Sequence, residues 1–203
     1  MSENAKKVYI EPLKREIING KVYLMAGAST GHDDVVGNLR FIFEKFLRGK
    51  PCKLYGESAN VYFDEDSPEV MPDLKIICDR SKIYKGKING APDLIIEVLS
   101  LRTKVRDATE KKDLYEKNGV REYWMVDPSK KTVEVYLLKD GKFVKDYVYN
   151  RLSKFEEYDV EEIESSGTED EKKLIQNRMI KTSLFGDDLI IDIDDIFYDM
   201  IED

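Results

Sequence analysis

The stretch "APDLIIEVLS" at residues 91–100 is the feature that most constrains how this chain can fold. Apolar residues run from Leu94 to Leu99 with one charged residue, Glu97, among them. A short, nearly continuous apolar run is typical of a central strand that is covered on both faces of its sheet. An ionised carboxylate in such a strand costs several kcal/mol unless a cation compensates it. The sequence therefore predicts a buried central strand with a cation beside Glu97, supplied by a metal ion or by a lysine.

The composition is that of an ordinary globular chain. It has 203 residues, of which 41% are hydrophobic and 36% charged, enough for one domain with a sizeable core. No stretch approaches the roughly 18 apolar residues of a transmembrane helix, and "MSENAKKVYI" is too polar for a signal peptide. We therefore expect a cytoplasmic protein with no membrane partner. Cys52 and Cys78 are expected to be reduced thiols, because the cytosol keeps thiols reduced.

The charged residues limit the chemistry that is available. A net charge of −8 argues against a protein that coats nucleic acid in general, but it is compatible with an acidic metal site inside a local basic rim. His32 is the single histidine of the sequence. A two-histidine metal site within one chain is therefore excluded, and a serine hydrolase triad would have to use His32.

Turn and periodicity signals predict a mixed α/β domain of the α+β type. Asn19-Gly20, between two alternating apolar stretches, predicts an N-terminal β-hairpin. Amphipathic spacing predicts a helix over residues 33–47, and a second helix is expected over 104–119. Strands are expected between residues 52 and 79, at 91–99, at 121–128 and in a hairpin that turns at 139–142.

The C-terminal quarter differs in composition from the rest. Residues from about 157 to 180 are highly acidic and are expected to form a solvated insertion in a single domain of residues 1–203. The following "TSLFGDDLIIDIDDIF" is expected to return to strand and short helix, with aspartates that keep the surface soluble. We therefore expect the acidic segment to lie outside the core.

Two acidic residues on separate predicted strands are placed to meet. Side chains alternate along a strand, so Asp93 and Glu97 share one face. Asp73, in "VMPDLKIIC", begins another predicted strand. If these strands are neighbours, Asp73 and Glu97 converge. A pair of carboxylates suits Mg²⁺ or Mn²⁺, with water and a substrate phosphate in the remaining positions.

A lysine on the second predicted helix adds a positive charge to this pattern. Lys111 lies one helical turn after Asp107. An ammonium group beside a metal-bound water and a phosphate stabilises developing charge or helps to position the nucleophile. Two carboxylates, a divalent cation and a lysine together indicate hydrolysis of a phosphodiester by a metal-activated water.

The order "MPDL … GAPDLIIEVLSLRTKVRDATEKKDLYEKNGVREYWMVDP" resembles the Uma2 family, also called DUF820, of the PD-(D/E)XK nuclease superfamily with its restriction-endonuclease-like fold. The similarity runs over residues 17–149, is densest over 72–128, and includes "SLFGDDLIIDIDDIF" as the closing segment. The resemblance implies a mixed central β-sheet flanked by helices. It also implies a divalent-metal-dependent endonuclease that acts on DNA, and nucleases of this fold often pair, so we expect a homodimer.

The resemblance also assigns roles to individual residues. It implies that Asp73 and Glu97 bind Mg²⁺ or Mn²⁺ and are catalytic together with Lys111. The superfamily pattern has a lysine two residues after the glutamate, a position that Leu99 occupies here, and the resemblance moves that role to Lys111. His32 matches a family histidine near the site and is a possible supporting residue.

Other interpretations of these residues stay open. Glu97 is also explained by an ion pair with a lysine, Asp73 by a turn cap and Lys111 by an exposed position on the helix. His32 could cap or pack its helix. Asp93 and Asp107 are further possible supporting residues, although Asp107 with Glu110 also fits a helix-capping pattern. Tyr115 and Trp124 are expected in the core.

Two rival functions also stay open. The chain could be a nuclease-fold binding or regulatory protein without catalysis, or a phosphodiesterase that acts on RNA or nucleotides. The acidic net charge and the lack of an evident basic, aromatic DNA-binding extension keep the second rival open. "RSKIYKGKING", with Lys82, Lys85 and Lys87, is the basic stretch expected near the site.

Overall fold

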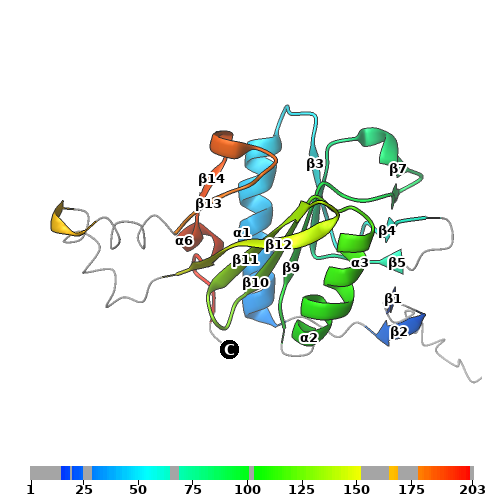
Figure 1. Ribbon diagram of the computed structural model, residues 1–203, viewed down its shortest axis with the longest axis horizontal. Coiled ribbons are helices and arrows are strands. Elements are labelled where there is room, and N and C mark those ends of the chain that lie inside the picture. The colour runs from blue at the N-terminus through cyan, green and yellow to red at the C-terminus, as the bar shows by residue number, and fades with distance from the viewer. Residues whose placement is uncertain are drawn as a thin grey trace, which may run out of the picture.

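The computed structural model describes residues 15–18, 20–24, 29–64, 69–100, 103–151, 165–168 and 178–201. Its centre is a mixed sheet with the strand order β12-β11-β10-β9-β6-β3 (Figure 1). The bounds are β3 Lys53–Gly56, β6 Leu74–Ile77, β9 Leu94–Val98, β10 Glu122–Asp127, β11 Thr132–Lys139 and β12 Lys142–Asn150. β9 and β10 run parallel, and the other neighbours run antiparallel. The predicted mixed α+β architecture is confirmed.

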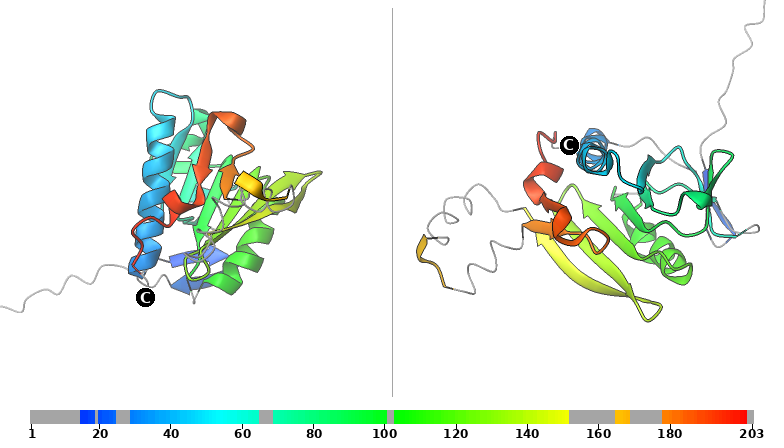
Figure 2. Two further views of the ribbon diagram at one scale, coloured as in Figure 1. Left: turned by 90° about the vertical axis from the view of Figure 1, so that its left-hand side faces the viewer. Right: turned by 90° about the horizontal axis from the view of Figure 1, so that it is seen from above.

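Helices cover both faces of the central sheet (Figure 2). Every residue of β6, β9 and β10 is buried, which explains why these strands appear in the sequence as nearly continuous apolar runs. Helix α1 (Thr30–Leu47) packs Val35, Leu39 and Phe43 against one face. It begins before the predicted start, because the hydroxyl of Ser29 accepts a hydrogen bond from the His32 amide and caps the first turn.

A helical segment between β9 and β10 covers the other face. It consists of α2 (Lys104–Arg106), the wider π-type turn η2 (Asp107–Lys111) and α3 (Lys112–Lys117), and Gly119, two residues after its end, has the left-handed conformation. Tyr115 packs against Tyr123 of β10 in this second core. Because side chains alternate along β9, Ile95 faces this core and Ile96 faces α1. Glu97 shares the face of Ile95.

The N-terminal hairpin predicted at Asn19-Gly20 is present, although Asn19 lies outside the described residues. Strands β1 (Arg15–Ile18) and β2 (Lys21–Leu24) pair antiparallel, and Gly20 has a φ of 77°. A small second sheet has the order β5-β4-β8-β7. Its strands are β4 Val61–Tyr62, β5 Glu69–Val70, β7 Ile83–Tyr84 and β8 Lys87–Asn89, and the 3₁₀ turn η1 (Arg80–Lys82) precedes β7.

The C-terminal elements pack beside α1 (Figure 2). They are β13 (Met179–Lys181), η3 (Gly186–Asp188), β14 (Ile190–Asp192) and α6 (Ile193–Ile196). Most of the acidic insertion expected at 157–180 lies outside the described residues. Its last residues enter β13, where Ile180 is fully buried, so this end of the segment belongs to the core.

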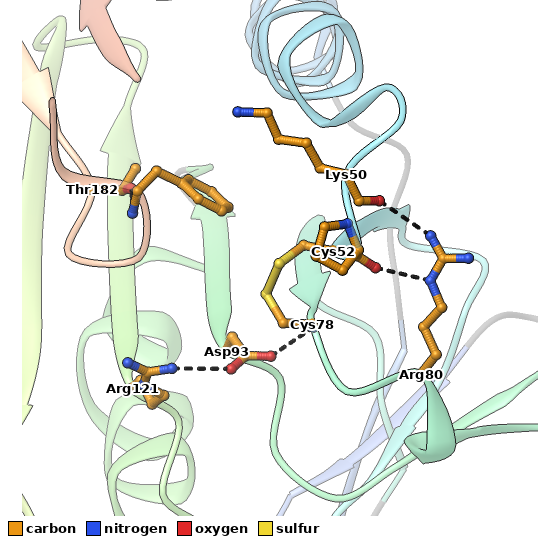
Figure 3. Close-up of a disulfide and its surroundings, with 9 residues drawn as sticks. Lys50, Cys52, Cys78, Arg80, Asp93, Arg121 and Thr182 are labelled. Carbon is orange, nitrogen blue, oxygen red and sulfur yellow. Dashed lines mark hydrogen bonds and ion pairs between the residues drawn. A yellow bond between two sulfur atoms is a disulfide. The ribbon is translucent and has the colours of Figure 1, made fainter. Parts of the chain in front are cut away.

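Cys52 and Cys78 form a disulfide, so the expectation of reduced thiols was wrong (Figure 3). Lys53 of β3 pairs with Ile77 of β6, which places the two cysteines opposite each other directly beyond this pair. The bond therefore joins the edge strand β3 to the strand that leads from Asp73. Spacing alone did not reveal it, because the antiparallel register of β3 and β6 had to be known first.

Candidate active site

Asp73 and Glu97 lie opposite each other on neighbouring strands. Leu74 of β6 pairs with Ile96 of β9 in antiparallel register, and the two acids occupy the next position in that register. The Oδ2 atom of Asp73 accepts a hydrogen bond of 2.8 Å from the amide of Val98, the residue after Glu97. The turn-cap interpretation of Asp73 therefore does not describe its contacts: the carboxylate reaches across to the neighbouring strand.

A lysine is the cation beside Glu97. The Nζ atom of Lys111 lies 2.9 Å from Oε1 of Glu97, and the hydroxyl of Tyr115 donates to the same oxygen at 2.6 Å. Burial raises the pKa of Glu97; the charge of Lys111 opposes this rise, and the surrounding carboxylates add to it. Tyr115 is a core residue, as expected, and it also contacts the site.

Lys111 stands among three carboxylates. Besides Glu97, its Nζ lies 3.2 Å from Oε1 of Glu16 and 3.4 Å from Oδ1 of Asp107. Its side chain is 4% exposed, which rules out the interpretation of Lys111 as an exposed helix lysine. Burial lowers the pKa of Lys111, but the charges of these carboxylates outweigh burial and the net direction is upward. The ammonium is therefore charged at neutral pH.

Asp107 does not cap its helix, contrary to the capping interpretation. The helical segment begins at Lys104, and Asp107 lies inside it, in the π-type turn, where only 1% of the residue is exposed. Its Oδ1 is buried without a hydrogen-bond partner. Burial raises the pKa of Asp107, against the charge of Lys111. The π-type turn, a feature frequent at functional sites, carries both Asp107 and Lys111 to the sheet.

Sequence reasoning missed Glu16, which the hairpin strand β1 brings to the site. Glu16 is fully buried, and its Oε1 accepts a hydrogen bond of 3.0 Å from the amide of Met71. Its Oε2 lies 3.5 Å from the guanidinium of Arg106. The sequence feature that could have revealed Glu16 is the alternation in "REII": Glu16 lies two residues before the apolar Ile18, and both side chains are buried. Glu16, Asp73, Glu97 and Asp107 are called the carboxylate cluster below.

Lys75 is a second missed residue. It is fully buried on β6 and lies two residues after Asp73, hence on the same face of the strand. Its Nζ donates to the carbonyl of Pro72 at 3.0 Å. Burial lowers the pKa of Lys75 to about 7, although the charges of Glu97 and Asp73 oppose the shift. The signal in the sequence was a single lysine within the apolar run "DLKIIC". Lys75 thus resembles Glu97, which is the single charged residue within the apolar run of β9.

His32, in the first turn of α1, lies at the edge of the site. Its Nε2 is 3.4 Å from Oδ2 of Asp73, and both side chains are 14% exposed. Burial lowers the pKa of His32, but the hydrogen bond and charge of Asp73, with the charges of Asp33 and Glu57, give a net rise. The exposure of Asp73 and His32 marks the side from which solvent reaches the otherwise buried cluster.

The structure does not bring Asp93 to this site. Asp93 precedes β9, whereas Glu97 lies near the other end of that strand. Its Oδ2 accepts a hydrogen bond of 2.8 Å from the amide of Cys78, and its Oδ1 lies 3.5 Å from Arg121 (Figure 3). Asp93 thus stabilises the chain at the disulfide. Among the contacts described, none joins Asp93 to Asp73, Glu97 or Lys111, so the structure does not support the expected supporting role.

The donor chemistry of Asp73 and Glu97 fits a magnesium-type ion. The hydrogen bonds described above are accepted by Oδ2 of Asp73 and by Oε1 of Glu97. Oδ1 of Asp73 and Oε2 of Glu97 take no part in these hydrogen bonds. Within the residues that the structure describes, no group of three or more His, Cys, Asp or Glu residues is arranged to hold a metal ion. Mg²⁺ commonly takes one or two carboxylates and completes its shell with water and substrate phosphate. Two carboxylates therefore suffice.

The same fold occurs in a solved crystal structure. The chain is similar to the crystal structure of "a putative nuclease belonging to DUF820" from Anabaena variabilis, with a TM-score of 0.65 and 18% identity over 90% of this chain and 89% of that one. At this identity the similarity establishes the fold. The chain also matches the model of the Uma2 family, described as "Putative restriction endonuclease", over residues 9–175, and it belongs to that family.

A sequence relative covers part of the same region. The chain is 26% identical over 128 residues to the uncharacterized protein slr1290 of Synechocystis sp., a match that spans 63% of this chain and 67% of that protein. The family and the fold that the resemblance predicted are therefore confirmed. The roles of the individual residues stay predictions.

Proposed function

We propose that the protein hydrolyses DNA phosphodiester bonds in a reaction that depends on Mg²⁺ or Mn²⁺. The observation that carries the proposal is the placement of Asp73 opposite Glu97 on adjacent strands, with the ammonium of Lys111 bonded to Glu97. Membership in a family whose model is described as "Putative restriction endonuclease" supports it. A site of carboxylates and a lysine is suited to phosphodiester hydrolysis, because the developing charge is negative and the attacking water must lose a proton.

Asp73 and Glu97 would hold the divalent ion through the oxygens that lie outside their protein hydrogen bonds. A bound ion of this type lowers the pKa of a coordinated water and stabilises charge on the phosphoryl oxygens. Lys111 orients Glu97 and adds a positive charge beside it. His32 and Asp73 are the partly exposed members, so we place the scissile phosphate on their side of the cluster.

Cleavage of supercoiled plasmid and of labelled duplex in Mg²⁺ or Mn²⁺, with chelator as the blank, tests the proposal. Asp73→Asn and Glu97→Gln should each lose about a hundredfold or more in rate, because each removes a charged ligand. Asp93→Asn is the matched control, since Asp93 is an acidic residue close to Glu97 in the sequence but contacts Cys78 and Arg121 instead. Equal rates in native chain and Glu97→Gln would contradict the proposal.

The same assays separate the rival functions. Cleavage of RNA or of a nucleotide phosphodiester without cleavage of DNA would make the protein a different phosphodiesterase, an alternative that the net charge of −8 keeps open. Binding of metal and nucleic acid with no cleavage of either would make it a binding or regulatory protein on a nuclease fold. The presence of both Asp73 and Glu97 favours catalysis over the binding or regulatory protein.

Organisation and location are part of the proposal. We infer that the chain forms a single domain that contains the acidic insertion. We also infer a homodimer, in which each subunit would cut one of the two DNA strands. Analytical ultracentrifugation measures whether the dimer forms. Across the described ranges, no helix is long and apolar enough to cross a bilayer. A cytoplasmic location stays a prediction. The disulfide Cys52–Cys78 argues against it, because disulfides are rare in the cytosol, and cell fractionation tests it.

A further inference from the structure

Glu16 contacts two parts of the site that are far apart in the sequence. Its Oε1 accepts from the amide of Met71, two residues before Asp73, and lies 3.2 Å from the ammonium of Lys111. It comes from the N-terminal hairpin and is fully buried. A buried carboxylate with a charged partner is costly to maintain, so its contacts with Lys111 and Arg106 require an explanation beyond packing.

The ammonium of Lys111 has two carboxylate partners besides Glu97, namely Glu16 and Asp107. Asp107 Oδ1, 3.4 Å away, is buried without a hydrogen-bond partner, as is Oε2 of Glu16. If Oε2 of Glu97 binds a divalent ion, the ion draws negative charge away from the carboxylate, and the attraction between Glu97 and Lys111 weakens. Glu16 and Asp107 remain to compensate the ammonium, so Glu97 can bind the ion without leaving a buried lysine unpaired.

We propose that Glu16 is a positioning residue of the active site, which holds the ammonium of Lys111 in place while Glu97 binds a divalent cation. The inference rests on the proposed function, since it assigns Glu16 to the same metal-dependent site. It makes the hairpin β1–β2 part of that site. Tyr23 of β2 fastens the hairpin to the helical segment through hydrogen bonds of 3.0 and 2.8 Å to Glu110.

The test is a double-mutant cycle with Glu16→Gln and Lys111→Met in the full chain. Glutamine keeps an oxygen for the amide of Met71 but removes the charge that Lys111 contacts. In the chain without metal, urea unfolding should show that the two substitutions are not additive, because both break the same ion pair. Additive effects would overturn the proposal, since Glu16 would then act only through Met71 and Arg106.

Calorimetry with Mn²⁺ gives the second readout. Glu16→Gln should weaken Mn²⁺ binding by about tenfold in the native background and by less than about twofold in the Lys111→Met background. A loss of affinity that persists without Lys111 would overturn the proposal, because it would reflect the through-space charge of Glu16. Glu110→Gln is the matched control: it also loosens the hairpin but does not touch Lys111, and its Mn²⁺ affinity should equal that of the native chain.

Two further results complete the test. If Lys111→Met does not fold, crystal structures of the native chain and of Glu16→Gln, each with Mn²⁺ bound, decide: the ammonium of Lys111 should keep its place in the native chain and shift in Glu16→Gln, and an ammonium in the same place in both would overturn the inference. A native chain that binds no Mn²⁺, even with a phosphate-bearing oligonucleotide, would overturn the metal-dependent function together with the part of the inference that concerns the ion. The coupling in the metal-free chain decides separately whether Glu16 positions Lys111.

Discussion

The ammonium of Lys111 and the carboxylate of Glu97 meet across 2.9 Å in the interior, where each residue is at most 3% exposed. This contact explains how a glutamate can occupy the otherwise apolar strand β9. It also means that a divalent ion would not enter an empty site, because it would share Glu97 with a lysine that already compensates it. In the proposal made above, Glu16 and Asp107, the other carboxylates beside Lys111, make that sharing possible.

Removal of Lys111 should destabilise the fold. Lys111→Met leaves several buried carboxylates without their common cation, and we expect a loss of about 3–5 kcal/mol in the free energy of unfolding. The neighbouring Lys112, which stands 3.9 Å above the ring of Tyr136, is the matched control, and Lys112→Met should cost about 1 kcal/mol or less. Urea unfolding measures both, and equal losses would show that the buried ion pairs contribute little.

Lys75 should make stability depend on pH. The pKa of Lys75 is lowered in the folded chain to about 7 from its ordinary value of 10.5. Between these values the unfolded chain binds more protons than the folded one, so the contribution of Lys75 to stability should rise with pH, by at most about 1.4 kcal/mol per unit. Below pH 7 its full cost is present. Lys75→Met should remove this rise; identical slopes in variant and native chain would contradict the assignment.

The disulfide should stabilise the edge of the sheet. Cys52 and Cys78 are 26 residues apart, and closing a loop of this length is worth about 2–4 kcal/mol. Reduction, or substitution of both cysteines by serine, should lower the urea midpoint accordingly. A titration that finds two free thiols in the native folded chain, or a midpoint unaffected by reductant, would contradict the bond.

The turn η1, the hairpin β7–β8 and the turn between these strands carry the basic stretch singled out in the sequence. Lys85 lies 5.1 Å from the ring centre of Tyr84, and Lys87 lies 4.6 Å from that of Tyr62, while Lys82 donates to the carbonyl of Ala91. Alanine at all three lysines should weaken DNA binding and make it less dependent on salt, by about one unit of slope for each phosphate that the variant no longer neutralises. Alanine at Lys139 and Lys142, in the β11–β12 turn, is the control; binding unchanged by the triple substitution would remove this hairpin from the interface.

Much of the framework was predictable because its signals are local. The apolar runs of β9 and β10 and the turns Asn19-Gly20 and Asp140-Gly141 identified the central strands and two hairpins. Glu97 and Lys111 were identified as candidate residues from their spacing and from the resemblance to the Uma2 family.

The remaining features depend on register and on contacts between distant segments. Glu16 and Lys75 are inward-facing charges whose burial becomes visible only when the hairpin and β6 are in place. The disulfide required the pairing of β3 with β6, which no spacing rule indicates. Asp107 fits a capping pattern in the sequence, but the helix begins earlier, at Lys104, and the π-type turn directs Asp107 to the cluster.

The most direct test of the account is calorimetry with Mn²⁺ on the native chain and on Glu97→Gln at the same pH. We predict that the native chain binds the ion and that Glu97→Gln loses at least about tenfold in affinity, because a neutral amide is a much weaker ligand for a hard cation. Equal affinities, or no binding by either chain in the presence of a phosphate-bearing oligonucleotide, would show that Glu97 serves only as the partner of Lys111. The protein would then have a nuclease fold without nuclease chemistry.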